Sequence, residues 1–353
     1  MPRPIQAKLD LSALESNLEI VRRSTSARIM SAIKADGYGH GLLRTAEALS
    51  ATDGYALLDI QDAVQLRERG FRQTILLLEG FFSTEDFPVI TEYELNCVIH
   101  NTQQIAMLDA YPGKETLDVW LKINTGMNRL GFAPQQIPQV MEQLNRHRAV
   151  RDITLMTHFA TADEVAGVAK PLALFNDVTA PYRLPRSLAN SAALLRYPET
   201  HGDWVRPGIM LYGSSPFGEL SAQQLELKPV MTLSSRIIAT QELQPGDEVG
   251  YGATFRAEQV MRIGVVACGY ADGYPRHAPN GTPIAVDGHR TRTVGRVSMD
   301  MLCVDLSNLP QVSVGGHVVL WGDGMPIDEV ARAAGTISYE LMCALAARVQ
   351  IVI

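Results

Sequence analysis

The first two thirds of the chain alternate short apolar runs with longer amphipathic stretches, and this alternation limits the folds available to it. The apolar runs that read as strands are Arg28–Lys34, Gly54–Leu58, Thr74–Gly80, Asn96–His100, Leu117–Ile123, Asp152–His158, Arg186–Asn190 and Trp204–Gly213. Helix-type stretches lie between them, such as Gln61–Arg69, Thr102–Asp109 and Pro134–Arg146. This pattern of strand–helix units predicts a (β/α)8 barrel. A doubly wound open sheet has the same local pattern, so periodicity leaves it as an alternative.

After Lys228 the pattern changes to β-type runs with few helical ones. The predicted strands are Ser234–Gln241, Arg262–Cys268, Thr282–Val286, Arg292–Val297, Leu302–Leu306 and His317–Trp321. Asp287-Gly288 between two of these runs is a strong hairpin signal. Two helix-like stretches, Ile327–Ala334 and Tyr339–Ala347, follow. We therefore expect an α/β protein with an N-terminal (β/α)8 barrel over residues 1–229 and a C-terminal, mostly β domain over residues 230–353.

Composition and charge exclude several classes of protein. The net charge of −7 comes without a basic stripe, so nucleic acid is not an expected partner. No apolar run is long enough to cross a membrane, and the start, Met1-Pro2-Arg3-Pro4-Ile5, lacks the apolar segment of a signal peptide. The four cysteines are widely spread without a CxxC pair, which favours free thiols in a reducing compartment. We expect a cytoplasmic protein.

Several motifs that would assign a function are absent from the sequence. There is no GxxxxGK[ST] phosphate loop, no HExxH and no GxSxG elbow. Gly37-Tyr38-Gly39-His40-Gly41 resembles a dinucleotide fingerprint but lacks its third glycine. The eight histidines lack metal-binding spacing, so no metal site is expected.

Lys34 ends an apolar run and is followed at once by a glycine-rich turn, Ala35-Asp36-Gly37-Tyr38-Gly39, and then by a helix-type stretch from Leu42 to Leu49. A strand that ends in lysine places an amine at the mouth of a parallel sheet. An amine held there can form a Schiff base with a carbonyl cofactor or substrate. The alternative is a surface lysine at a strand end, and this pattern alone does not exclude it.

The segment around Lys34 and eight segments downstream resemble the alanine racemase family. In family order these are Ala32-Ile33-Lys34-Ala35-Asp36-Gly37-Tyr38-Gly39-His40-Gly41, Lys122-Ile123-Asn124-Thr125-Gly126-Met127-Asn128-Arg129-Leu130-Gly131, Thr157-His158-Phe159-Ala160, Asn190-Ser191-Ala192, Trp204-Val205-Arg206-Pro207-Gly208-Ile209, Gly250-Tyr251-Gly252-Ala253, Gly269-Tyr270-Ala271-Asp272-Gly273-Tyr274, Ser298-Met299-Asp300-Met301 and Ser338-Tyr339-Glu340. They span nearly the whole chain. The resemblance implies an enzyme that interconverts L-alanine and D-alanine, uses pyridoxal 5′-phosphate, and forms a homodimer with shared active sites. The product, D-alanine, implies a link to peptidoglycan supply or to alanine catabolism.

The resemblance implies a role for each of the central residues. Lys34 carries the cofactor and serves as one base, and Tyr251 of the partner chain serves as the other. Tyrosine has an ordinary pKa near 10, so a neighbouring relay must lower it, and His158 and Arg206 match that relay. Arg206 also matches the residue that faces the pyridine nitrogen. Because arginine only donates hydrogen bonds, it should leave that nitrogen unprotonated and limit transamination.

The resemblance also implies a set of binding residues. Those for the cofactor are Lys34, Tyr38, His158, Asn190, Ser191, Arg206, Gly208, Ile209 and Tyr339. Arg129 and the backbone N–H of Met299 match the holders of the substrate carboxylate. Lys122 matches a lysine that is often carbamylated, whereas Asp163, Tyr270, Arg276 and Arg296 match residues of the substrate's access corridor. Each has a structural alternative, such as a packed tyrosine, a snorkelling lysine or a solvated surface charge.

Three rival functions remain open at this stage. A broad-specificity amino-acid racemase and a pyridoxal-phosphate-dependent amino-acid decarboxylase share the barrel and the β domain. The decarboxylase family carries an acidic residue at the pyridine nitrogen, and Arg206 argues against it. A non-catalytic cofactor carrier could be built on the barrel alone, and the second domain and Tyr251 argue against that.

Overall fold

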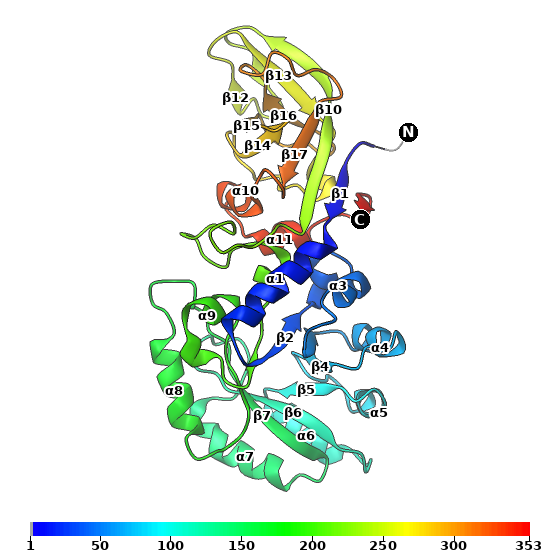
Figure 1. Cartoon of the computed structure of the whole chain (residues 1–353), viewed down its shortest axis with the longest axis vertical. Coiled ribbons are helices and arrows are strands. Elements are labelled where there is room, and N and C mark those ends of the chain that lie inside the picture. The colour runs from blue at the N-terminus through cyan, green and yellow to red at the C-terminus, as the bar shows by residue number, and fades with distance from the viewer. Residues whose placement is uncertain (1–2) are drawn as a thin grey trace.

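Eight parallel strands form a closed barrel in the computed structural model, which describes residues 3–353 (Figure 1). The strands are β2 (Arg28–Ala32), β3 (Gly54–Leu57), β4 (Thr74–Leu77), β5 (Asn96–Ile99), β6 (Leu117–Lys122), β7 (Val150–Met156), β8 (Arg186–Ser187) and β9 (Trp204–Val205). The last strand pairs with the first, with Ile29 opposite Val205. The predicted barrel is therefore confirmed, and the open doubly wound sheet is excluded.

Most strands of the barrel end earlier than the apolar runs predict. The run Trp204–Gly213 is a strand only to Val205 and continues as the 3-10 helix η4 (Ile209–Tyr212), whose side chains are all buried. The run Arg186–Asn190 leaves the sheet after Ser187, although Leu188 and Ala189 remain buried. The difference arises because residues beyond the ladder are apolar for another reason: they belong to the core outside the barrel interior, where η4 packs against α1 (Leu11–Ser24).

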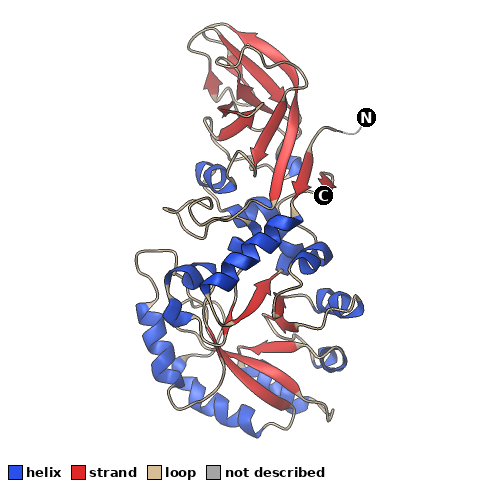
Figure 2. Ribbon diagram, in the orientation of Figure 1, coloured by secondary structure: helices blue, strands red, loops and turns tan. Residues whose placement is uncertain are grey.

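Helices surround the barrel on its outer face (Figure 2). They are α1 (Leu11–Ser24), α3 (Leu42–Ala48), α4 (Ile60–Glu68), α5 (Phe87–Glu92), α6 (Thr102–Ala110), α7 (Ile137–Arg146), α8 (Ala169–Thr179) and α9 (Ser191–Arg196). The short segment α2 (Lys34–Tyr38) is a left-handed turn at the mouth of the barrel. Side chains cap the N-termini of several of these helices by accepting hydrogen bonds from their first N–H groups. The Asp10 carboxylate accepts the Ser12 and Ala13 N–H groups of α1, and Asn101 accepts the Gln104 N–H of α6.

The barrel interior is a packed apolar plug rather than a channel. The inward side chains are Met30, Ala56, Leu76, Val98, Trp120, Met156 and Trp204, all of them buried. Trp120 and Trp204 lie with ring centroids 5.6 Å apart, and the Trp120 indole N–H donates to Asn96 at 3.0 Å. Side chains can therefore reach an open space only at the carboxyl ends of the strands.

The second domain is built on an eight-stranded, mostly antiparallel sheet in the order β13-β16-β15-β14-β17-β10-β1-β18. Its strands are β1 (Gln6–Leu9), β10 (Met231–Leu243), β13 (Met261–Val266), β14 (Pro283–Val286), β15 (His289–Val294), β16 (Leu302–Asp305), β17 (His317–Trp321) and β18 (Gln350–Val352), with the pair β11 (Glu248–Val249) and β12 (Phe255–Arg256) beside them. The predicted hairpin is present between β14 and β15, where Asp287 and Gly288 both have positive φ. Helices α10 (Ile327–Ala333) and α11 (Ser338–Cys343) complete the domain.

The first strand of the chain lies outside the barrel, although the barrel domain was expected to include all of residues 1–229. Strand β1 pairs antiparallel with β10 and parallel with β18, both in the second domain. Its alternation explains this, because Ala7 and Leu9 are buried while Lys8 is exposed, the pattern of a sheet with one solvated face. The polypeptide thus starts in the second domain and enters the barrel through α1 (Figure 1).

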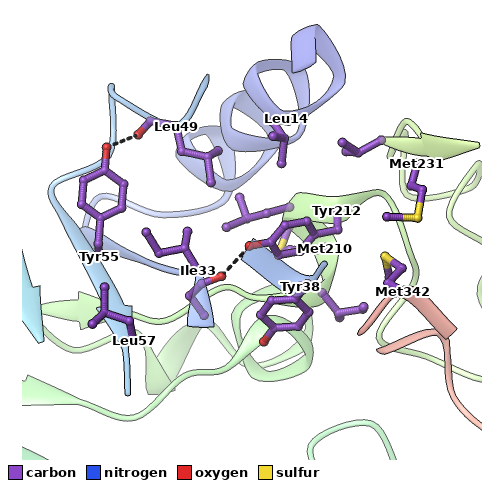
Figure 3. Packing of buried hydrophobic residues seen from close by; sticks show 14 of the residues in the cluster. Leu14, Ile33, Tyr38, Leu49, Tyr55, Leu57, Met210, Tyr212, Met231 and Met342 are labelled. Atoms are coloured by element: carbon purple, nitrogen blue, oxygen red, sulfur yellow. Dashed lines mark hydrogen bonds between the residues drawn. The ribbon is translucent and has the colours of Figure 1, made fainter. Parts of the chain in front are cut away.

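The two domains meet at the mouth of the barrel. The Ser215 N–H donates to the carboxylate of Asp328 in α10 at 3.1 Å, and the hydroxyl groups of Ser214 and Ser338 lie 2.6 Å apart. Helix α11 packs against the turn after Lys34 so closely that a Cβ at Gly39 would collide with the Met342 carbonyl. Figure 3 shows Tyr38, Tyr212 and Met342 in this junction. The second domain therefore supports the segment that carries Lys34.

Candidate active site

Lys34 lies two residues beyond β2, at the start of a left-handed turn. Ala35, Asp36, Gly37 and Tyr38 all have φ between 53° and 60°, of which only Gly37 is a glycine. Left-handed backbone costs an ordinary residue roughly 1–2 kcal/mol, so such a run persists only where its surroundings enforce it. The glycine-rich turn that the sequence predicts is present, but three of its left-handed residues, Ala35, Asp36 and Tyr38, are not glycine.

Hydrogen bonds to the side chain and the backbone of Asp36 hold this turn. Its carboxylate accepts the Leu42 N–H at 2.6 Å, and its carbonyl accepts the Gly41 N–H at 2.8 Å. A Cβ at Gly37 would lie 2.5 Å from Thr45 Oγ1, so helix α3 leaves no room for a side chain there. Lys34 and Tyr38 consequently leave the turn in fixed directions.

A cavity of about 600 Å³ opens at the carboxyl ends of the barrel strands. It is lined by Ala32, Lys34, Ala35, Tyr38, Ala56, Leu58, Leu78, Glu79, Lys122, Arg129, Leu130, Met156, His158, Asn190, Ser191, Arg206, Gly208, Ile209, Tyr339 and Cys343. Every residue that the sequence analysis assigned to the cofactor lies in this lining, and so do Arg129 and Lys122. The mouth of a barrel is the usual place for an active site in this fold.

The cavity is rich in positive charge. Burial lowers the pKa of Lys34, and the nearby Arg129 lowers it further. Burial, followed by Arg206 and Arg129, lowers the pKa of Lys122 to about 8. Both amines are therefore easier to deprotonate than a lysine in water, which is what an amine needs to act as a nucleophile or a base.

Arg206 is fully buried beside His158. Its guanidinium donates to Ser187 Oγ at 2.6 Å and to the Thr157 carbonyl at 2.6 Å, and it lies 3.4 Å from His158 Nδ1. Burial lowers the pKa of Arg206 to about 10, which leaves it charged near neutral pH. Burial and then Arg206 hold the pKa of His158 well below its ordinary value. A neutral imidazole can accept from Arg206 at Nδ1.

One side of the cavity combines backbone N–H groups with hydroxyl groups. Ser191 begins α9, and its hydroxyl accepts the Gly208 N–H at 2.9 Å. The ring of Tyr38 lies 5.8 Å from that of Tyr339, and a Cβ at Gly208 would lie 2.7 Å from Tyr38 Oη. Hydroxyl groups and amides at such a wall suit an anionic group.

A second group of expected site residues lies away from this cavity. Tyr251 is in the turn between β11 and β12, and Met299 is in the turn between β15 and β16. Their exposed fractions are 71% and 53%, so their own chain leaves both largely uncovered. The expected corridor residues are also exposed and outside the lining: Asp163, Tyr270, Arg276 and Arg296. The single chain brings together one half of the expected site and not the other.

Sequence reasoning missed Glu79, the sole carboxylate among the residues that line the cavity. It lies two residues after β4, and its charge raises the pKa of both Lys34 and Lys122. The sequence could have identified Glu79, because an acidic residue at the carboxyl end of a barrel strand faces the same mouth as Lys34. The supports of Arg206, namely Thr157 and Ser187, were also missed; they follow from strand alternation only once the register is known.

Two features are absent from the described part of the chain. Within residues 3–353, no cluster of histidine, cysteine, aspartate or glutamate side chains is placed to hold a metal ion. Over the same range, every helix is too short or too polar to cross a bilayer.

Comparisons with known proteins agree over the whole length of the chain. The model of the alanine racemase N-terminal domain matches residues 9–216, and that of the C-terminal domain matches residues 230–353. An alanine racemase of Nitrosospira multiformis is 60% identical, with 99% of each chain covered. A catabolic alanine racemase of Klebsiella aerogenes is 51% identical over 100% of this chain and 99% of its own. The crystal structure of the biosynthetic alanine racemase of Pseudomonas aeruginosa superposes with a TM-score of 0.95 at 44% identity, covering 99% of both chains.

Proposed function

The chain belongs to the alanine racemase family, and on that premise we propose that it interconverts L-alanine and D-alanine with pyridoxal 5′-phosphate bound at Lys34. The observation that carries the proposal is the position of Lys34, an amine of lowered pKa fixed at the mouth of a cation-rich cavity. We further propose a homodimer in the cytoplasm that acts by two bases.

The residues of the cavity fit this cofactor. Its aldehyde needs an amine, which Lys34 provides, and its phosphate needs donors that do not have to be charged. Tyr38, Ser191, Gly208, Ile209 and Tyr339 supply hydroxyl and backbone groups along one wall. The absence of a Cβ at Gly208 leaves space beside Tyr38 Oη that a side chain would fill.

The bound cofactor would delocalise the negative charge that develops when the α-proton of an amino acid leaves. Arg206 would face the ring nitrogen of the cofactor, and since arginine only donates, this nitrogen would stay unprotonated. Asn190 and His158 would help to keep Arg206 and the ring in place. His158 Nδ1 lies within reach of Arg206, and Asn190 Nδ2 donates to the Phe159 carbonyl at 3.3 Å.

Racemisation removes a proton from one face of Cα and returns one to the other. Lys34 would serve one face and Tyr251 of the partner subunit the other, while Arg129 and the N–H of Met299 of the partner subunit would hold the substrate carboxylate. The exposure of Tyr251 and Met299 in their own chain supports this shared arrangement. Tyr270, Arg276, Arg296 and Asp163 would then border the access route.

Two measurements test the proposal. The protein with added cofactor should convert L-alanine to D-alanine, followed as a loss of optical rotation. Borohydride reduction should then fix the pyridoxyl group on the peptide that contains Lys34, and Lys170, which is exposed and outside the cavity, serves as the control. Release of carbon dioxide would instead indicate a decarboxylase. A label on another lysine would refute the assignment of Lys34.

A further inference from the structure

The turn Ser298–Met301 is fixed to the short helix η5 (Tyr270–Asp272), although the Met299 side chain is exposed. Ala271 donates to the Met299 carbonyl at 3.0 Å, and Tyr270 donates to the Ser298 carbonyl at 3.0 Å. A Cβ at Gly269 would collide with both of these carbonyls. Within residues 3–353 the Met299 N–H has no acceptor, so the turn presents a donor that is rigid and free.

Two arginines from opposite ends of the chain, Arg3 and Arg348, also hold this turn. Arg348 donates through Nε to Asp272 at 2.7 Å and through Nη2 to Asp300 at 2.7 Å. Arg3 donates to the Asp300 carbonyl at 2.8 Å and to the carboxylates of Asp300 and Asp272 at 3.2 Å each. The Arg348 guanidinium thus bridges η5 and the turn with charge-assisted hydrogen bonds.

Asp272 needs the hydrogen bonds of this bridge because its carboxylate is buried. Its side chain is completely buried, and its carboxylate accepts Arg348, Arg3 and the Gly269 N–H at 2.9 Å. A buried carboxylate needs such partners, because an unpaired charge out of water is costly. Asp300 is more exposed, and its hydrogen bond with Arg348 holds its pKa below the usual value.

We propose that Arg348 is a positioning residue for substrate binding, which places the Met299 N–H by bridging Asp272 and Asp300. The inference rests on the proposed function, in which this N–H holds the substrate carboxylate in the partner's site. Isolated ion pairs at a surface contribute little stability. The convergence of Arg348 and Arg3 on this short turn is therefore better explained by a need to hold the Met299 N–H in place. A binding group must be held to about 0.5 Å by its supports, and Arg348 meets that need.

Arg348→Met should therefore weaken carboxylate binding rather than the chemical step. We expect KM for alanine to rise about tenfold with kcat changed less than about twofold, the pattern of an interaction made equally in the ground and transition states. Propionate, which has a carboxylate and no amine, should bind the holoenzyme about tenfold more weakly by calorimetry. Cofactor affinity should stay the same, because the cofactor residues lie in the barrel cavity.

Two variants provide controls. Arg292→Met removes a similar ion pair, with Asp305 at 3.1 Å, in the same domain but away from the turn, and it should leave KM and propionate affinity unchanged. Arg348→Lys keeps the charge and should restore part of the affinity. If Arg348→Met does not fold, Asp300→Asn tests the same bridge while leaving the Arg348–Asp272 pair in place, and it should also raise KM.

The outcomes separate this inference from the proposed function. If the wild-type protein racemises alanine and Arg348→Met keeps its KM and its propionate affinity, the positioning role is overturned. A lower melting temperature with a lower kcat and unchanged KM would likewise show a structural role only. If the wild-type protein binds propionate without racemising alanine, the proposed function fails, and weaker propionate binding by Arg348→Met still supports the positioning role.

Discussion

Nη2 of Arg206 lies 3.4 Å from Nδ1 of His158 in the cavity wall, where Arg206 is buried and His158 is partly buried. Burial and the neighbouring cation both disfavour an imidazolium, so His158 stays neutral near neutral pH. Arg206 is held in turn by Ser187 and Thr157. The wall therefore presents the Arg206 guanidinium as a fixed, positively charged hydrogen-bond donor. An aspartate or glutamate at the same place would present an acceptor.

Replacing this donor should change the electronic properties of the bound cofactor. Arg206→Glu should allow the ring nitrogen to hold a proton, and a long-wavelength absorbance band should appear when alanine is added. Racemisation should slow by about a hundredfold, because charge stabilisation at the site is disrupted. The control is Arg206→Lys, which keeps the positive charge and should lack the new band. Unchanged spectra and rates in Arg206→Glu would mean that Arg206 is not the partner of this nitrogen.

The place of Lys34 could be predicted from sequence because strand ends of a parallel barrel share one mouth. The shape of the turn after it could not. Three of the four left-handed residues, Ala35, Asp36 and Tyr38, are not glycine, so local propensity gives no signal for them. Their conformation depends on contacts with Leu42, on the tight fit of Gly37 against Thr45 and on α11.

Long-range pairing accounts for the other differences from the sequence prediction. The sequence analysis assigned no strand to Gln6–Leu9, because so short a stretch becomes a strand only through its pairing with β10 and β18, far along the chain. The bridge from Arg348 to Asp272 and Asp300 is hidden for the same reason. The roles of Tyr251 and Met299 came from family resemblance alone, since their own chain leaves them exposed.

The negative charge of Glu79 should control how easily Lys34 loses its proton. Glu79 raises the pKa of Lys34, so Glu79→Gln should lower it, and more of the amine should be neutral at a given pH. In the cofactor-free protein, the rate at which Lys34 reacts with added cofactor should then reach its midpoint at a lower pH. Arg129 also faces this amine and keeps its charge in the variant, whereas the pKa of Lys122 should fall together with that of Lys34, because Glu79 raises both.

A matched control for Glu79 lies in the same loop. Glu85 is exposed in η1 (Thr84–Asp86) and outside the cavity, so Glu85→Gln removes one negative charge without changing the lining. Its reaction profile should coincide with that of the wild type. A profile of Glu79→Gln that stays unshifted, or moves to higher pH, would contradict the assigned influence of Glu79.

Lys122 is expected to carry a carbamate. Carbamylation requires a neutral amine, and a pKa of about 8 leaves roughly a tenth of the amine neutral at pH 7. The new negative charge would be paired by the surrounding cations, Arg129 and Arg206, which now repel Lys122. Protein incubated with ¹³C-labelled bicarbonate should show a carbamate resonance that Lys122→Met lacks. A crystal structure with a bare amine at this position near neutral pH would count against it.

Tyr251 should be needed for one enantiomer more than for the other. With Lys34 and Tyr251 on opposite faces of Cα, Tyr251→Phe removes one base and leaves the other. In deuterated water the variant should still exchange the α-proton of one enantiomer while exchange of the other is lost, and both should slow in Lys34→Ala. Equal exchange of both enantiomers by Tyr251→Phe would mean that a single base is sufficient.

The last prediction concerns the assembly of the site from two chains. Lys34 lies in the barrel cavity, whereas Tyr251 lies exposed in the second domain of the same chain. Lys34→Ala and Tyr251→Phe should each be nearly inactive alone. After they are unfolded, mixed and refolded together, about half of the dimers pair one of each, and each such dimer has one site with both defects and one with neither. Roughly a quarter of the activity of wild-type protein refolded in the same way should return. If Tyr251 served the Lys34 of its own chain, every site would keep one defect and mixing would restore nothing.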